Sequence, residues 1–202
     1  MEPRTRTIRS RAAGVAAFVA LAALGACRSA PAALPGSAAL PWKGSLNIEQ
    51  TGNSCGPHSA MAAIFVATGA TLDPREIDRS IGSRMANGYT WPWGVARFLR
   101  ANGVTAKIRW HALQPDSDRL TWVRARIADG HPVIVIVGTR RYLHYVTVLG
   151  YSGERFSLYD SLKGADLNGA APGNLDLSAT ELLAWWKGAV WKGIPINLSI
   201  GG

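Results

Sequence analysis

The chain has 202 residues and a mass of 21.5 kDa, a length typical of one domain with a short appendage, which excludes a large multidomain enzyme. Hydrophobic residues make up 48% of the chain and charged residues 17%, so a buried core is expected and disorder over most of the chain is excluded. The formal net charge is +9, and the two cysteines are too few for a disulfide-rich miniprotein or a four-cysteine zinc site.

The basic excess lies partly at the N-terminus. Residues 1–26 hold four arginines and one glutamate, so removing this segment lowers the net charge from +9 to +6. The remaining basic residues are scattered, without a long basic run or an aromatic RNA-binding signature. We therefore predict no nucleic-acid partner.

Residues 1–27 have the organisation of an export signal. Basic residues up to Arg11 precede an uncharged run of fifteen residues, Ala12–Ala26, which is shorter than the roughly 20 residues of a transmembrane helix. The run closes on Leu24-Gly25-Ala26-Cys27, which resembles the bacterial lipobox. We predict that Cys27 is lipidated and anchors the protein to a membrane; ordinary signal-peptidase cleavage or an uncleaved anchor are the alternatives.

All three alternatives export the domain, and the lipid anchor predicts a place in the cell envelope. Arg28 follows the predicted anchor in place of aspartate, which by resemblance to sorted lipoproteins favours the outer membrane of a double-membraned bacterium, facing the periplasm. Residues 28–41 are rich in alanine and proline and predict a flexible tether. Residues 42–202 are expected to form one domain.

The first half of this domain predicts helices. Residues 55–68 carry a proline in the first turn and end at Gly69, and Asp73 with Glu76 forms a capping box for a second helix ending near residue 81. A third helix is expected over residues 90–102.

The second half predicts strands and two further helices. The segment 132–137, PVIVIV, is typical of a buried central strand, and Ser152-Gly153-Glu154 is typical of a hairpin turn. The other expected elements are a strand over 104–110, a helix over 120–128, the hairpin strands 142–151 and 155–159, a helix capped by Ser178 and Glu181 through Trp186, and an edge strand over 194–200. This order predicts an α+β fold with N-terminal helices packed on an antiparallel sheet.

Cys55 lies at the predicted start of the first helix. If Cys27 is acylated, Cys55 is the only thiol left, and it is either a buried apolar residue or a nucleophile. The unpaired N–H groups and the dipole of a helix N-terminus favour the thiolate. This context favours the nucleophile.

A base and an orienting carboxylate follow on the predicted hairpin. His144 lies inside an apolar strand, where an unpartnered imidazole is costly, and the hairpin register brings it close to Asp160. Gln50, five residues before Cys55, is a candidate donor to an oxyanion, a role that Asn53 or a backbone amide could also fill. A cysteine, a histidine and an aspartate in this arrangement are typical of acyl transfer.

Several motifs together resemble the C39-like branch of papain-fold cysteine peptidases. The resemblance covers residues 47–162 and rests on Gln50, the segment SCGPHSAM at 54–61, GHPVIVIV at 130–137, LHYVTVLGY at 143–151 and YDS at 159–161. It implies a papain-like fold with Cys55 as nucleophile, His144 as general base, Asp160 as orienting group and Gln50 as oxyanion donor. Ser161 stands where relatives often have proline.

The resemblance implies a peptidase acting on a peptide or protein, without a cofactor. The best-known relatives cleave leader peptides after a double glycine as domains of export ATPases, whereas this chain has no Walker motif. The alternatives are a cell-wall amidase or acyltransferase with the same residues, and a catalytically silent peptide-binding domain.

Other polar and aromatic residues are assigned no catalytic role. His58 is expected on the helix surface, and the scattered histidines predict no metal site. The eight tryptophans are expected mainly in the core. The alternative for Trp91 and Trp93 is a loop that lines a substrate groove.

Overall fold

The structure, a computed structural model, describes residues 33–164 and 172–202. The predicted signal peptide, Cys27 and the first part of the predicted tether lie outside the described residues. Leu34–Gly202 forms one structural unit. No helix in the described ranges combines the length and the apolar character needed to cross a membrane.

Five α-helices occur in the described part of the chain. Asp73 caps α2 by accepting a hydrogen bond from the Arg75 backbone N–H at 2.8 Å, and Ser178 and Glu181 form a reciprocal capping box at α5. The helices are α1 (Cys55–Thr68), α2 (Pro74–Ser80), α3 (Pro92–Ala101), α4 (Asp116–Ala128) and α5 (Ala179–Gly188), and the 3-10 turn η1 spans Gly44–Leu46.

A seven-stranded antiparallel sheet forms the centre of the fold. Its strands are β1 (Ser37–Ala39), β2 (Lys107–Trp110), β3 (Val133–Gly138), β4 (Leu143–Ser152), β5 (Arg155–Tyr159), β6 (Leu175–Ser178) and β9 (Leu198–Gly201). The order is β2-β9-β3-β4-β5-β6, and β1 pairs with the end of β4 beyond the β3 ladder. A separate hairpin joins β7 (Val190–Trp191) to β8 (Ile194–Pro195).

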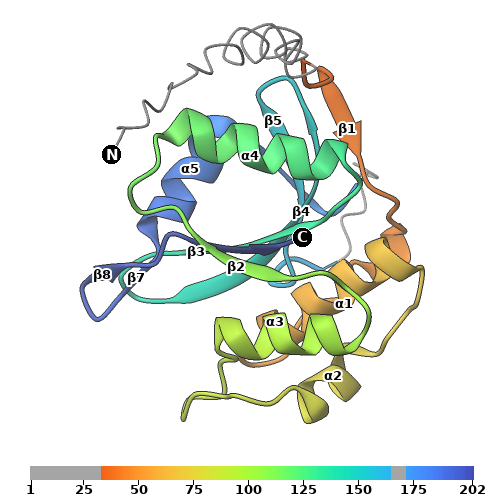
Figure 1. The fold of residues 1–202 in the computed structure, drawn as a ribbon. Coiled ribbons are helices and arrows are strands. Elements are labelled where there is room, and N and C mark those ends of the chain that lie inside the picture. The colour runs from red at the N-terminus through yellow and green to blue at the C-terminus, as the bar shows by residue number, and fades with distance from the viewer. Residues whose placement is uncertain (1–32, 165–171) are drawn as a thin grey trace, which may run out of the picture. The chain divides into compact units, whose positions relative to one another are not determined.

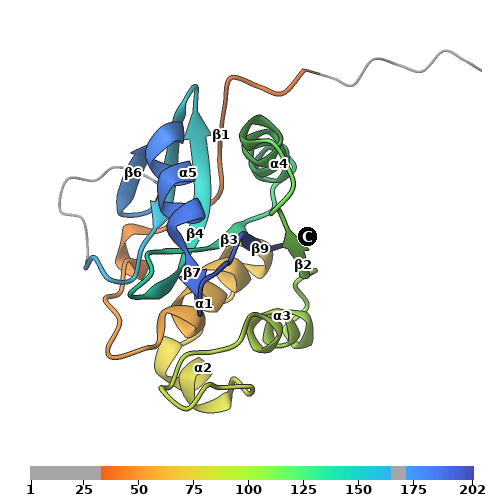
Figure 2. The ribbon, with the colours of Figure 1, turned by 90° about the vertical axis from the view of Figure 1, so that its left-hand side faces the viewer.

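Helix α1 is the central helix of the domain. It is buried from Cys55 to Phe65, because small residues let it pack closely against α2, α3 and β4. Its C-terminal cap is Gly69 in the left-handed conformation. Figures 1 and 2 show α1, α2 and α3 gathered below the sheet, whereas α4 and α5 lie above it. The first residue of α1 is thereby held at the boundary between the helices and the sheet.

The predicted α+β class is confirmed, and so are the buried central strand β3, the β4–β5 hairpin and the Ser178–Glu181 capping box. Asp73 caps α2, but the predicted capping box with Glu76 is wrong, because the Asp73 side chain accepts from the Arg75 backbone N–H instead. The prediction of a tether as far as residue 41 is wrong for Ser37–Ala39, which pair with β4, and for Leu40, which is buried. The predicted edge strand over 194–200 is also wrong. The chain forms β8 first, and β9 then lies between β2 and β3.

Gly138 closes β3 at the turn into β4. Its φ is +148°, and a Cβ atom at this position would lie 2.2 Å from the Tyr142 carbonyl oxygen. Gly103 also has a positive φ, +78°, but a Cβ atom there would meet nothing within 4 Å. The two positions therefore separate backbone strain from steric overlap.

We expect Gly103→Ala to lower the free energy of unfolding by about 1 kcal/mol, through backbone strain alone. Gly138→Ala should lower it by about 2–4 kcal/mol, because steric overlap adds to the strain. Urea denaturation of both variants measures the difference. Equal losses would contradict a close approach of the Tyr142 carbonyl to Gly138.

Candidate active site

Cys55 is the first residue of α1 and is 1% exposed. The loop before it is fixed by the Ser54 hydroxyl, which donates to the Thr51 carbonyl at 2.7 Å. On the other side, Gly56 packs on Thr90: a Cβ atom at Gly56 would lie 3.1 Å from Thr90 Cβ. The thiol is thus held at a helix N-terminus, where the dipole favours negative charge.

His144 and Asp160 meet at the ends of the β4–β5 hairpin. The ladder ends with Thr147 opposite Tyr159, and Asp160 is the first residue after β5. The Asp160 Oδ1 atom lies 2.7 Å from His144 Nε2, and both residues are 2% exposed. The predicted proximity of the two residues is confirmed.

Asp160 is held through its carboxylate by a backbone N–H and through its own backbone by an asparagine amide. Oδ1 also accepts from the Leu162 backbone N–H at 2.9 Å. Asn174, which is buried, accepts from the Asp160 N–H at 2.8 Å and donates to the Asp160 carbonyl at 2.9 Å. Asn174 was not predicted, since nothing in its local sequence indicates that it contacts a residue fourteen positions away.

The surroundings of His144 favour its protonated form. Burial of the ring acts to lower its pKa, but hydrogen bonds to Asp160 and Cys55, with the charges of both groups, outweigh burial and raise the pKa of His144 to about 9. Since Nε2 faces Asp160, Nδ1 is the ring nitrogen left for the thiol. His144 is therefore hydrogen-bonded to Asp160, and the Cys55 thiol lies close enough to the ring to contribute to the raised pKa of His144.

Gln50 is held by Ser161. Its backbone N–H donates to the Ser161 carbonyl at 2.7 Å, and its Oε1 accepts from the Ser161 hydroxyl at 2.7 Å. Its Nε2 donates one hydrogen bond to the Gly52 carbonyl at 2.7 Å, which uses one of its two amide hydrogens. Asn53 instead donates to the Asn87 carbonyl at 2.6 Å.

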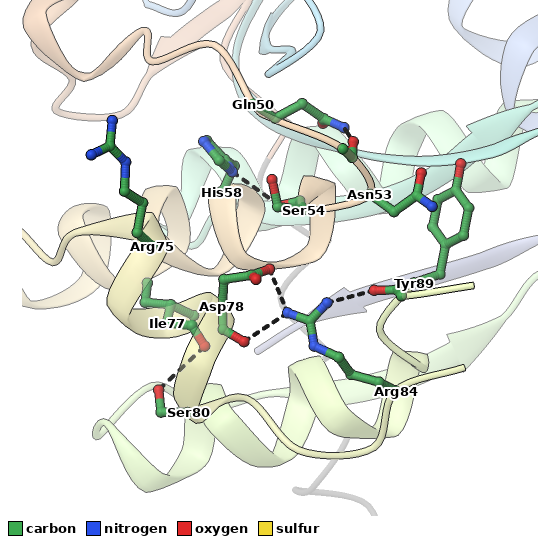
Figure 3. Close-up of polar contacts among 12 residues, drawn as sticks. Gln50, Asn53, Ser54, His58, Arg75, Ile77, Asp78, Ser80, Arg84 and Tyr89 are labelled. Atoms are coloured by element: carbon green, nitrogen blue, oxygen red, sulfur yellow. Dashed lines mark hydrogen bonds and ion pairs between the residues drawn. The ribbon is translucent and has the colours of Figure 1, made fainter. Parts of the chain in front are cut away.

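Figure 3 shows Gln50, Asn53 and Ser54 on the loop that leads into α1, with His58 one turn further. The prediction that His58 lies on the helix surface is wrong, because His58 is 4% exposed and its Nδ1 lies 2.9 Å from the Ser54 carbonyl. Burial lowers the pKa of His58, although the hydrogen bond to Ser54 opposes this. His58 therefore supports the loop from within the core.

The tryptophans divide between the core and the surface near Cys55. Trp186 is fully buried, as expected, and the neighbouring Trp185 lies over the His144 ring, with 6.1 Å between centroids. Trp91 and Trp93 are stacked at 4.5 Å and line a cavity, so the core interpretation is wrong for both. The expected loop position holds for Trp91, the N-cap of α3, but is wrong for Trp93, which lies in the first turn of that helix, and the substrate-groove alternative stays a prediction. Trp185 was not assigned to the site from sequence, because a tryptophan pair in a helix predicts only packing.

No group of histidine, cysteine and acidic side chains in the described ranges is arranged to hold a metal ion. In the described part of the chain, the candidate site therefore consists of protein side chains and backbone groups around Cys55, His144 and Asp160.

Comparisons with known proteins relate this chain to peptidases by fold. No family model and no curated protein matches the sequence. A putative C39-like peptidase from Bacillus anthracis aligns with a TM-score of 0.54 and 13% identity, over 82% of this chain and 96% of that one. A double glycine motif protease from an AMS/PCAT transporter, in complex with the leader peptide, aligns with a TM-score of 0.50 and 15% identity, over 82% and 91%. A cysteine protease from Carica candamarcensis aligns with a TM-score of 0.47 and 14% identity, over 82% and 97%. The chain has the fold of C39-like, papain-like cysteine peptidases.

We expect Asp160→Asn to lower the pKa of His144 from about 9 toward its ordinary value of 6.5 or below, because burial of the ring then acts without the carboxylate. Histidine NMR titration of the ¹⁵N-labelled protein measures this change. His58 and His111 are controls, since burial holds the pKa of each below the ordinary value without contact to Asp160. An unchanged His144 titration would contradict the hydrogen bond to Asp160 as a cause of the raised pKa of His144.

The raised pKa also makes stability depend on pH. His144 stays protonated up to about pH 9 in the folded state but only to about 6.5 when unfolded. Its contribution to stability is therefore complete below pH 6.5 and is lost as the pH rises through 9. The free energy of unfolding, measured by urea denaturation, should therefore differ most between wild type and Asp160→Asn below pH 6.5, and the difference should become smaller as the pH rises to 9.

Proposed function

We propose that the protein is an exported cysteine peptidase that hydrolyses a peptide or related amide bond through Cys55, His144 and Asp160. The observation that carries the proposal is the buried contact between His144 and Asp160, beside a cysteine at a helix N-terminus. The peptidase-like fold supports it.

In the proposed mechanism the Cys55 thiolate attacks the substrate carbonyl carbon. Protonated His144 gives its proton to the leaving amine, and an acyl-thioester with Cys55 results. Neutral His144 then takes a proton from water, which attacks the thioester and releases the acid and the thiolate. Asp160 keeps Nε2 occupied, so that Nδ1 faces the reacting atoms in both steps.

The oxyanion formed in each step needs two donors. The Cys55 backbone N–H is at the start of α1, and the second hydrogen of Gln50 Nε2 is not used by the Gly52 carbonyl. Preorganised donors of this kind stabilise a tetrahedral intermediate by several kcal/mol, about 2.7–4 for one donor. Gln50 is therefore proposed as the oxyanion donor, with Asn53 engaged elsewhere.

The proposed location is the cell envelope. The basic segment, the fifteen apolar residues Ala12–Ala26 and the lipobox-like Cys27 support export and lipid attachment, and Arg28 supports the outer membrane. A lipid anchor limits the substrate to peptides or proteins that reach this surface.

We expect Cys55 alkylation by iodoacetamide to remain fast well below the pH of about 8.5 at which an ordinary cysteine ionises. His144→Ala should slow it at pH 6, because the imidazolium no longer stabilises the thiolate. All proteins carry Cys27→Ser so that one thiol reacts, and His131→Ala, at an exposed histidine outside this site, is the matched control. Mass spectrometry follows the rate between pH 4 and 9.

In the same preparations, hydrolysis of a proteome-derived peptide library should occur with the wild-type site and fall by about 10³-fold or more in Cys55→Ala. If Cys55 is alkylated with the pH dependence of an ordinary cysteine and no peptide is hydrolysed, the proposed enzymatic activity is refuted. The alternative of a catalytically silent peptide-binding domain then remains. Turnover of purified cell-wall fragments instead of peptides would identify the amidase alternative.

We expect the full-length protein, produced in a bacterium fed an alkyne fatty acid, to be labelled and to fractionate with the outer membrane. Cys27→Ser should abolish the label, because no thiol remains at the lipobox. Cys55→Ser is the matched control and should keep it. A label that persists in Cys27→Ser would refute the proposed anchor.

A further inference from the structure

A cavity of about 520 Å³ opens beside the candidate active site. Its walls come from the segment 85–93 before and into α3, the turn between β3 and β4, the β7–β8 hairpin and Trp110 of β2. Arg84 supports the first of these walls by donating to the Gly88 carbonyl and pairing with Asp78, as Figure 3 shows. The cavity is thus bounded by two hairpin turns and a braced loop.

The cavity adjoins Cys55 through shared residues. Thr90 lines it and packs on Gly56, next to the nucleophile. Tyr145 and Leu143 also line it; the Tyr145 hydroxyl donates to the Thr90 carbonyl at 2.8 Å, and Leu143 precedes His144. The charge of Cys55 contributes to raising the pKa of Tyr145 after burial, which is consistent with this proximity. A substrate bound at Cys55 can therefore extend into the cavity.

The cavity exposes aromatic surface. The Trp91 ring stacks on Trp93 and meets the edge of Trp191, with 5.3 Å between the centroids of Trp91 and Trp191. Trp93 is 49% exposed and Trp110 is 59% exposed. A cluster of large aromatic side chains left in contact with water is typical of a binding surface.

The rim of the cavity is cationic. Arg140 and Arg141 lie in the β3–β4 turn, and Lys192 lies in the β7–β8 turn with its Nζ 5.2 Å from the Trp191 ring centroid. Among the described residues none of these three cations forms an ion pair, and the lining contains no carboxylate. The aromatic surface is therefore combined with positive charge that the described chain does not neutralise.

We propose that this cavity is the specificity pocket of the site and selects peptides in which a large aromatic or apolar side chain adjoins an acidic side chain. The inference rests on the proposed function for its scissile bond. The aromatic side chain packs on Trp91 and Trp93, and the carboxylate pairs with Arg140, Arg141 or Lys192. A basic side chain in place of the acid is repelled by the same cations.

The test uses the full-length protein and four matched fluorogenic peptides that differ at two adjacent positions: Trp-Glu, Trp-Gln, Trp-Lys and Ala-Glu. We expect kcat/KM for Trp-Glu to exceed that for Trp-Gln by about fivefold, a rim ion-pair effect, and Trp-Lys to be poorer still. Ala-Glu should be poorer than Trp-Glu by about tenfold or more, because the aromatic contact is lost.

The double variant Arg140→Gln/Arg141→Gln should bring the ratio of Trp-Glu to Trp-Gln close to one. The matched control is Arg75→Gln/Arg79→Gln, which makes the same charge change at exposed residues of α2 outside the cavity and should keep the ratio. Trp93→Ala should reduce the advantage of Trp-Glu over Ala-Glu. A ratio that survives in Arg140→Gln/Arg141→Gln overturns the inference.

Calorimetric binding of the same peptides to the Cys55→Ala variant separates the pocket from the chemistry. Preferential binding of Trp-Glu without cleavage by wild type supports the pocket and refutes the proposed function. Cleavage of all four peptides at equal rates supports the function and refutes the pocket. A preference for Trp-Lys or Trp-Gln also overturns the inference.

Discussion

The buried hydrogen bond between His144 and Asp160 is the contact on which the arrangement of the site depends. An imidazole at 2% exposure on an apolar strand is costly unless a partner compensates its lost hydration. Asp160 is that partner, and it is itself fixed by Leu162 and Asn174. The same contact sets the ring orientation, so the stability of the hairpin end and the orientation of the His144 ring have one physical cause.

The position of Cys55 depends on a different set of contacts, made by the helical side of the fold. Gly56 permits α1 to approach Thr90, and Asn53 joins the loop before α1 to the segment that contains Asn87. Cys55 is thereby placed by α1 and α3, whereas His144 and Asp160 are placed by the sheet. Cys55 and His144 are brought to one region of the fold because α1 packs directly on β4, so a shift in that packing would change their separation.

The features that sequence predicted are those with a local cause. Pro57 and Gly69 delimit α1, Ser178 and Glu181 cap α5, and the turn at Gly153 pairs β4 with β5. The turn alone does not bring His144 to Asp160: the β4–β5 register shifts by one residue between Val148 and Gly150, and this shift places both residues on the same face of the hairpin. The features that sequence missed depend on distant partners. β9 is a short apolar segment whose place between β2 and β3 follows from the closure of the sheet, and Ser37–Ala39 become a strand only because β4 extends beyond β3. His58 is buried because α1 is covered on every side, which its local sequence does not show.

Ser161 shows how one departure from a family pattern acquires a physical meaning. Its carbonyl accepts from the Gln50 backbone and its hydroxyl donates to Gln50 Oε1. Proline, which often occupies this position in relatives, could keep the carbonyl contact but has no hydroxyl to orient the amide. Since Ser161 follows Asp160 directly, Gln50 and His144 are both positioned by adjacent residues of one turn. A displacement of this turn would therefore disturb the contacts of Gln50 and of His144 together, so the positions of the two side chains are coupled in this chain.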